Sequence, residues 1–110
     1  MYGAPRGVLL LAEIGGMAAG CAAVRRLDNV TCELKRVYVR SDFRGSGMGR
    51  RLTEIALQAA REIGYARIRL DTLPQMAAAQ RLYESLGFRD IPPHYGDPMA
   101  GQRFMEAALS

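Results

Sequence analysis

Three glycines at alternate positions, Gly45, Gly47 and Gly49, separate an extended apolar segment from a segment with helical spacing. Because glycine has no side chain, the backbone of such a turn can approach a ligand closely. Its N–H groups, together with the start of the helix, form an anion site. The spacing matches neither a P-loop nor a dinucleotide-binding turn. The segment predicts a strand–turn–helix unit that holds an anion, with a plain glycine-rich loop as the alternative.

Four arginines, Arg40, Arg44, Arg50 and Arg51, lie in or beside this turn. Fourteen of the fifteen basic residues are arginine, Lys35 is the other, and the formal net charge is +4. A basic surface attracts polyanions such as nucleic acid, acidic lipid or a phosphorylated small molecule. Dispersal over a solvated surface explains the total charge equally well, whereas the clustering at the turn favours a polyphosphate ligand.

The whole chain, residues 1–110, predicts one domain of mixed strands and helices. Apolar and alternating runs predict strands at 7–14, 17–27, 31–40, 65–71, 88–91 and 102–109. Helical spacing predicts helices at 50–63 and from a capping box at 72–75 to about residue 86. The expected fold is therefore α/β (α+β), a mixed, mostly antiparallel sheet flanked by helices, in the order β-β-β-α-β-α-β-β.

Two local features refine this expectation. Asp28 and Asn29 tolerate the backbone of a tight turn, which predicts a hairpin between the second and third strands. In the third strand, Leu34 belongs to one alternation phase, whereas Val37 and Val39 belong to the other. One inserted residue near 35–36, a β-bulge, explains the slip, and relaxed patterning of an edge strand is the alternative.

Several classes of protein are excluded by composition. The longest strongly apolar run, residues 7–12, is too short to span a membrane, and no signal peptide is evident. Cys21 and Cys32 are too few for a disulfide framework and favour a cytoplasmic protein with free thiols. His94 is the only histidine and is expected in a surface loop or at an acceptor site. No ligand spacing predicts a metal site.

Two motifs carry a family resemblance. The segment Arg44-Gly-Ser-Gly-Met-Gly49 resembles the Arg/Gln-x-x-Gly-x-Gly/Ala acetyl-CoA signature of the GCN5-related N-acetyltransferases (GNAT). The segment Ala79-Gln-Arg-Leu-Tyr-Glu-Ser-Leu-Gly-Phe88 resembles the A-x-x-L-Y-x-x-x-G-F pattern on the last helix of that family. The separation of the motifs and the expected element order also resemble the family, so the resemblance covers nearly the whole chain.

The resemblance implies an N-acetyltransferase that moves the acetyl group of acetyl-CoA to an amine acceptor by direct attack. It implies cofactor contacts by Val37, Tyr38, Val39, Arg44, Gly45, Ser46, Gly47, Met48, Gly49 and Arg50. It also implies that Tyr83 is the general acid for the leaving thiolate, a core tyrosine being the alternative. Glu33 matches a carboxylate that could act as general base, and a solvated carboxylate paired with an arginine is the alternative.

The chain departs from the family pattern in two places. Residues 1–6 leave no room for the strand and two helices with which the fold usually begins, and Met76 stands where an Asn is frequent. We therefore expect a homodimer that shields the sheet, or a chain that is a piece of a longer product. The alternative function is a catalytically impaired CoA-binding or protein-interaction module. Small-molecule and peptide amines both remain open as acceptors, and nucleic acid is the least favoured partner.

Overall fold

The computed structural model describes residues 7–14, 16–43, 45, 47–93 and 100–109. The strands are β1 (Gly7–Ile14), β2 (Met17–Arg26), β3 (Thr31–Val39), β4 (Arg67–Thr72), β5 (Arg89–Ile91) and β6 (Arg103–Ala108). The helices are α1 (Met48–Ile63), α2 (Ala77–Ser85) and a 3₁₀ turn, η1 (Ser41–Phe43). The predicted order of strands and α-helices is confirmed, and η1 is the addition that the sequence patterns did not indicate. None of the described helices is long and apolar enough to cross a membrane.

The strands form one six-stranded sheet in the order β1-β2-β3-β4-β6-β5. Strands β1, β2 and β3 make the expected antiparallel meander, β3 and β4 are parallel, and β6 pairs antiparallel with β4 and β5. In the hairpin between β2 and β3, Asp28 Oδ1 accepts hydrogen bonds from the N–H groups of Val30 and Thr31. The sheet is therefore mixed and mostly antiparallel, as predicted.

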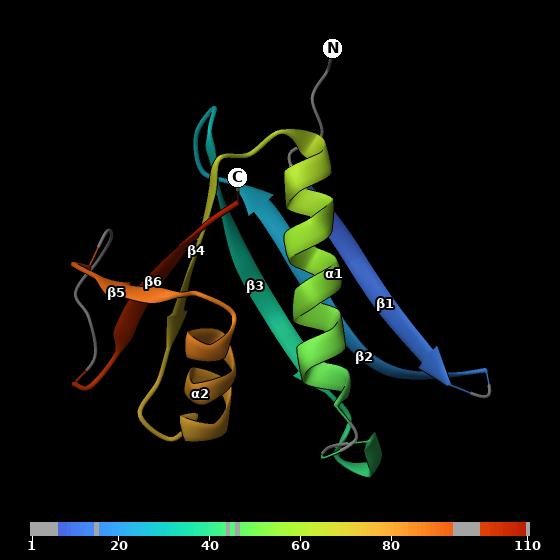
Figure 1. The fold of residues 1–110 in the computed structure, drawn as a ribbon. Helices are drawn as coiled ribbons and strands as arrows, with labels where there is room; N and C mark the ends of the chain where they lie inside the picture. The colour runs from blue at the N-terminus through green and yellow to red at the C-terminus, as the bar shows by residue number, and fades with distance from the viewer. Residues whose placement is uncertain (1–6, 15, 44, 46, 94–99, 110) are drawn as a thin grey trace.

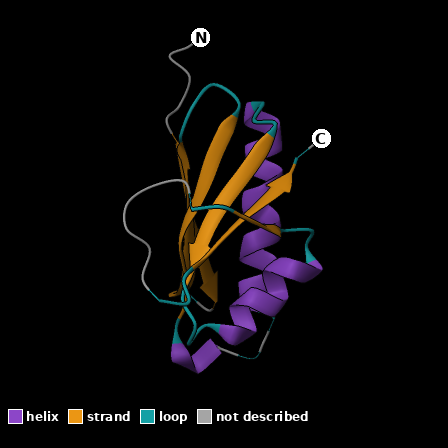
Figure 2. Cartoon of the chain, turned by 90° about the vertical axis from the view of Figure 1, so that its left-hand side faces the viewer, coloured by secondary structure: helices purple, strands orange, loops and turns teal. Residues whose placement is uncertain are grey.

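Both α-helices cover the same face of the sheet (Figures 1 and 2). Leu52 and Ala56 of α1 are buried against β2 and β3, and Tyr83 of α2 is buried near Ile68 and Met105 in the same core cluster. Full burial of a leucine side chain such as that of Leu52 contributes about 1.5–3 kcal/mol to stability. The core therefore lies between the helices and one face of the sheet.

The opposite face of the sheet carries a row of charges. Across β2, β3, β4 and β6 the register places Arg25 opposite Glu33, Glu33 opposite Arg69, and Arg69 opposite Glu106. Arg25 pairs with Glu33 at 2.8 Å and Arg69 pairs with Glu106 at 2.7 Å. Opposite charges at directly facing positions stabilise a sheet, so this polar face is internally compensated.

The helix boundaries differ from the predictions at two positions. Helix α1 begins two residues earlier than expected, because Gly47 adopts a left-handed conformation (φ 85°) and acts as its N-cap. It ends at Gly64, as predicted, where φ is 112°. The capping box predicted at 72–75 is wrong: Thr72 is buried at the end of β4, and a turn closed by the hydrogen bond from Met76 N to Leu73 O precedes α2.

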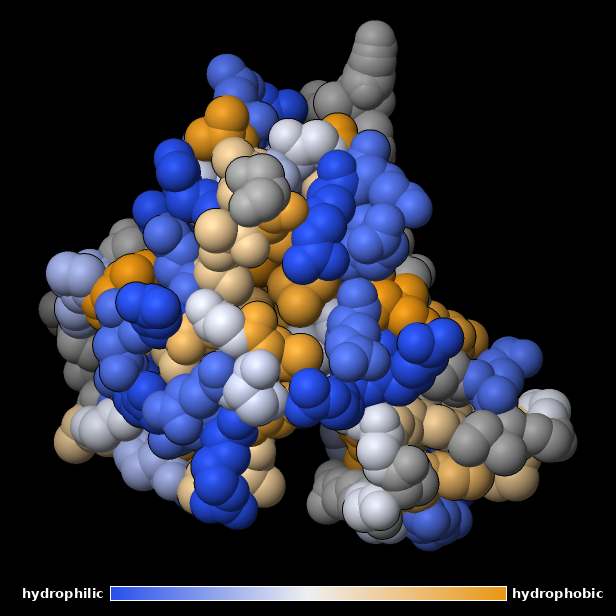
Figure 3. All heavy atoms as spheres, in the orientation of Figure 1, coloured by the Kyte–Doolittle hydropathy of each residue, from blue (hydrophilic) through white to orange (hydrophobic). Residues whose placement is uncertain are grey.

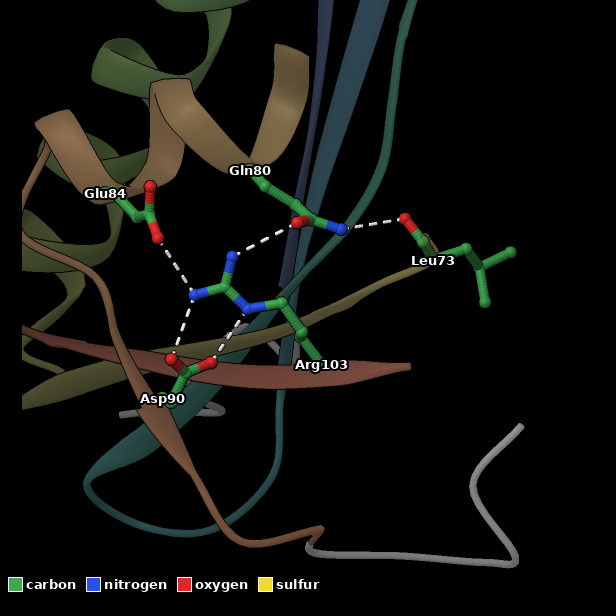
Figure 4. Close-up of polar contacts among 5 residues, drawn as sticks. All are labelled: Leu73, Gln80, Glu84, Asp90 and Arg103. Atoms are coloured by element: carbon green, nitrogen blue, oxygen red, sulfur yellow. Dashed lines mark hydrogen bonds and ion pairs between the residues drawn. The ribbon is translucent and has the colours of Figure 1, made fainter. Parts of the chain in front are cut away.

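A polar cluster holds α2 against the far edge of the sheet (Figure 4). Arg103 of β6 donates hydrogen bonds to Glu84 and Gln80 on α2 and to Asp90 on β5. The amide of Gln80 in turn donates to the carbonyl oxygen of Leu73 at 2.8 Å. One guanidinium thus joins α2, β5, β6 and, through Gln80, the turn after β4, because its planar fork offers several donors at once.

Candidate functional site

The site begins where β3 and β4 separate. The two strands are paired only at Thr31–Arg67, Cys32–Ile68 and Glu33–Arg69, although β3 continues to Val39 and β4 to Thr72. Parallel neighbours in a regular sheet stay paired along their length. Beyond Glu33, the edge of β3 therefore faces a gap rather than β4.

The predicted β-bulge in β3 is confirmed and turns side chains into this gap. On β2, Ala23 faces Lys35 while Cys21 faces Tyr38, so β3 has one residue more than its partner between these pairs. An extra residue reverses the face on which the following side chains lie. As a result Val37 and Val39 point to the helix-covered side, where both line a cleft. Tyr38 points away from the cleft, with 51% of its surface exposed.

The cleft has a volume of about 460 Å³ and lies between the end of β3, the glycine turn and α2. Figure 3 shows the surface hollowed between α2 and the turn before α1. The lining residues are Val37, Val39, Phe43, Gly45, Gly49, Gln75, Met76, Ala78, Ala79, Leu82 and Tyr83. The wall is mostly apolar, and one end of it is formed by backbone at the start of α1. Such a cleft suits an extended ligand with an apolar arm and an anionic end.

The glycine turn presents backbone rather than side chains to this cleft. Gly45 and Gly47 have φ values of 83° and 85°, a region that other residues enter only at a cost. No described side chain caps α1, so the N–H groups of Met48, Gly49 and Arg50 form the positive end of the helix. Met48 itself packs against the core. The predicted cofactor residues Arg44 and Ser46 lie outside the described residues.

The Arg50 side chain does not line the cleft. Its Nη1 donates a hydrogen bond to Ser85 Oγ at 2.9 Å, and its Nε lies 3.4 Å from Glu54. Arg50 therefore links the start of α1 to the end of α2.

Among the described residues that line the cleft, Tyr83 is the one with an ionisable side chain. It is 5% exposed, lines the cleft from α2, and packs against Phe88 with ring centroids 5.6 Å apart. Burial raises the pKa of its phenol above the ordinary value of 10.0. The hydroxyl therefore stays protonated at neutral pH and is a donor.

A second, smaller cavity of about 230 Å³ adjoins the cleft. It is lined by Leu34, Lys35, Val37, Leu70, Asp71, Met76 and Tyr83, and Val37, Met76 and Tyr83 line both cavities. Lys35 and Asp71 come from the two diverging strands, with Nζ and Oδ1 3.7 Å apart. The sequence interpretation did not select either residue. The sequence features that could have indicated them are a charged residue near the predicted bulge and a second charged residue at the end of the adjacent strand.

Glu33 lies outside the lining of both cavities. It is fully buried, with Oε1 2.8 Å from Arg25 Nε and Oε2 3.7 Å from Lys35 Nζ. The arginine pairing considered for Glu33 is therefore confirmed, whereas its expected solvation is wrong. Glu33 pairs with Lys35, and Lys35 lines the smaller cavity. His94 lies outside the described residues, and among the side chains that are described no group of three or more His, Cys, Asp and Glu forms a metal site.

Comparison with known proteins decides the family. The model of the acetyltransferase (GNAT) family matches residues 1–88, which include the glycine turn and Tyr83. The chain belongs to the GNAT family. It is 38% identical over 111 residues to an uncharacterized N-acetyltransferase of Schizosaccharomyces pombe, a match that covers 99% of this chain and 68% of that protein.

Solved structures of acetyltransferases have the same fold. The ribosomal-protein-S18-alanine N-acetyltransferase of Escherichia coli superposes with a TM-score of 0.82 at 26% identity, covering 96% of this chain and 70% of that one. YncA of Salmonella typhimurium, solved with its cofactor acetyl-CoA, superposes with a TM-score of 0.77 at 31% identity, covering 93% and 64%. This GNAT chain spans only 31% and 46% of two further curated relatives, from Dictyostelium discoideum and Escherichia coli.

Proposed function

We propose that this GNAT chain transfers the acetyl group of acetyl-CoA to the amine of an acceptor by direct attack. The observation that carries the proposal is the separation of β3 from β4 beside an apolar cleft that ends at the glycine turn. An extended ligand can pair with the edge of β3 like an added strand while its anionic end reaches the start of α1.

The residues fit acetyl-CoA along its length. The backbone of Val37 and Val39 would hold the extended arm, with the Tyr38 peptide group between them. The N–H groups of Gly45, Gly47, Met48, Gly49 and Arg50 would hold the pyrophosphate, because they combine left-handed glycines with the start of a helix. When bound, acetyl-CoA supplies the acetyl group as a thioester.

Tyr83 is proposed as the general acid. Its protonated phenol lines both cavities and can donate a proton to the sulfur that leaves as the carbon–sulfur bond breaks. An acceptor ammonium loses two protons as its amide forms. One returns to the Tyr83 phenolate and the other goes to solvent, so Tyr83 ends each cycle protonated. Glu33 would act on the acceptor only indirectly, since Lys35 separates it from the smaller cavity.

Calorimetric titration with acetyl-CoA tests the cofactor site, using Gly49→Glu and Gly49→Gln as a matched pair. Gly49 lines the cleft without a left-handed φ, and a Cβ there would lie 3.9 Å from Val39 Cγ2, an ordinary contact. A glutamate at this position adds a negative charge beside the proposed pyrophosphate site, and glutamine adds the same volume without charge. We expect micromolar binding to the wild type and a much larger loss for Gly49→Glu than for Gly49→Gln.

Absence of acetyl-CoA binding to the wild type would refute the proposed cofactor site. Equal losses in the two Gly49 variants would refute the placement of the pyrophosphate at this turn. Binding with no thiol release in the presence of any amine would refute the transferase and leave a CoA-binding module.

We also propose that the protein self-associates through the β1 edge of the sheet. Leu11 and Met17, at the β1–β2 hairpin, are 59% and 48% exposed, and among the strands that the structure describes β1 pairs with β2 alone. Exposed apolar residues on an edge strand favour pairing with another chain. Sedimentation velocity at micromolar concentration should show a dimer, and a monomer would contradict this assignment.

A further inference from the structure

The charged residues at one end of the smaller cavity indicate what kind of ligand it favours. Lys35 Nζ lies 3.7 Å from both Glu33 Oε2 and Asp71 Oδ1, and Glu33 also pairs with Arg25. Two positive and two negative groups thus form one cluster whose formal charges cancel. A cluster without net charge does not strongly attract a ligand that is purely cationic or purely anionic. It can, however, replace an ion pair between its own residues by ion pairs with a ligand that carries both a positive and a negative group.

Lys35 and Asp71 are the members of this cluster that line the cavity. Their side chains are 36% and 21% exposed, so both are accessible to a ligand. Each also has a second partner. Glu33 lies beside Lys35, and Gln102 donates a hydrogen bond to Asp71 Oδ2 at 2.9 Å. These second contacts orient the two charged groups, and they would keep both side chains in place if the Lys35–Asp71 pair were broken.

The remaining walls set the other properties of the ligand. Leu34, Leu70 and Met76 are apolar, and Tyr83 connects the cavity to the cleft proposed for acetyl-CoA. A volume of about 230 Å³ suits a small molecule rather than a folded chain. An amine held beside Asp71 would lie in the same cavity as the Tyr83 hydroxyl.

We infer that Lys35 and Asp71 select a small acceptor that carries both an ammonium and a carboxylate, such as a free α-amino acid. This inference rests on the proposed acetyl transfer and adds the chemical class of the acceptor. Asp71 accepts hydrogen bonds from the ammonium, and Lys35 donates to the carboxylate. The two ligand pairs replace the internal Lys35–Asp71 pair. An amine without a carboxylate would break the Lys35–Asp71 pair without giving Lys35 a new carboxylate in exchange.

The test compares free α-amino acids with the corresponding α-amino acid amides, using release of the coenzyme A thiol from acetyl-CoA. Each pair has the same side chain and the same amine but differs in the carboxylate. The amide's amine is the more readily deprotonated of the two, so a preference for the acid cannot come from amine reactivity. We expect kcat/KM to favour acids about fivefold or more, the factor for a half-exposed ion pair of ~1 kcal/mol.

Four variants make the test specific. Lys35→Met should abolish the preference for acids, and Lys35→Arg should retain most of it, because the positive charge remains. Arg89→Met is the matched control. It removes one positive charge from an exposed residue of β5 outside both cavities and should leave the preference unchanged. Asp71→Asn should lower kcat/KM for acids and amides alike.

The outcomes separate this inference from the proposed function. No acetyl-CoA binding by calorimetry would refute the proposed function itself. With acetyl-CoA bound, equal rates for acids and amides, or acetylation of neither, would overturn the inference. A preference that persists in Lys35→Met, or that is also lost in Arg89→Met, would overturn the assignment of specificity to Lys35. Circular dichroism of each variant identifies any that fails to fold. If Lys35→Met is one of these, Lys35→Gln takes its place, and a preference for acids that persists in Lys35→Gln would overturn the assignment.

Discussion

The same substitution, glycine to alanine, should have opposite effects on stability at two glycines beside the cleft. Gly20 on β2 faces Val39 on β3, directly after the bulge. A Cβ at Gly20 would lie 2.6 Å from the carbonyl oxygen of Tyr38 and 3.0 Å from Leu52 Cδ1. Non-bonded carbon–oxygen contacts need about 3.3 Å, so β2 and β3 would have to separate locally by roughly 0.7 Å.

Overpacking of this kind costs about 1–3 kcal/mol, and the obstruction here is backbone that cannot rotate away. We therefore expect Gly20→Ala to lower the free energy of unfolding by ~2 kcal/mol. For a domain of this size, ~1 kcal/mol changes Tm by about 4 °C, so Tm should fall by about 8 °C. Because Val39 lines the cleft, the same displacement should also weaken acetyl-CoA binding.

Gly49 is the matched comparison. It is the second residue of α1, and its added Cβ would be in ordinary contact with Val39 at 3.9 Å. Alanine stabilises a helix relative to glycine by up to ~1 kcal/mol in the interior and by less in the first turn. Gly49→Ala should therefore raise the free energy of unfolding by ~0.5 kcal/mol and Tm by about 2 °C.

Thermal unfolding followed by circular dichroism, at one protein concentration and without ligand, measures both effects. The reasoning fails if Gly20→Ala is as stable as the wild type, since the close approach of β2 and β3 would then be absent. It also fails if Gly49→Ala unfolds at a lower temperature, since Gly49 would then need a conformation that only glycine adopts.

Three further predictions concern single groups. Tyr83→Phe should lower kcat about 100-fold with little change in acetyl-CoA affinity, and an unchanged kcat would remove Tyr83 from the reaction. Because burial raises the Tyr83 pKa above 10.0, wild-type kcat should show no alkaline decline due to this group below about pH 10. Hydrogen bonds from Arg103 lower the pKa of Asp90, so its contribution to stability is present above pH 3.8 and is lost as pH falls through the lowered pKa. The difference in unfolding midpoint between wild type and Asp90→Asn should therefore shrink below about pH 4 in denaturant titrations. Burial raises the Cys32 pKa to about 12, so iodoacetamide at pH 8 should label Cys21 and spare Cys32 in peptide mass spectrometry.

The sequence predicted the features that arise from local periodicity and local turns. The strands, both α-helices, the bulge in β3 and the end of α1 at Gly64 all follow from side-chain alternation, helical spacing or a glycine. The start of α2 was missed for a tertiary reason. Thr72 and Gln75 have the chemistry of a capping box, but β4 extends through Thr72, which pairs with Arg103 across the sheet.

The candidate site was only partly predictable for the same reason. The glycine turn and Tyr83 belong to contiguous motifs, so one segment suffices to find each of them. Lys35 and Asp71 become neighbours only because β3 and β4 are adjacent in the sheet and then diverge. The complete burial of Glu33 likewise depends on the strands on both sides of it. No local pattern in the sequence carries this information.

The short pairing between β3 and β4 has a mechanical consequence. It divides the protein into two blocks, one of β1, β2, β3 and α1, the other of β4, β5, β6 and α2. Besides three residue pairs, the contacts between the blocks include the hydrogen bonds from Arg50 to Ser85 and from Arg61 to the Leu109 carbonyl, the Lys35–Asp71 ion pair, and the core that both helices share. A ligand bound between the blocks would contact both of them and stabilise their folded arrangement. A higher concentration of this ligand would therefore make the whole protein harder to unfold.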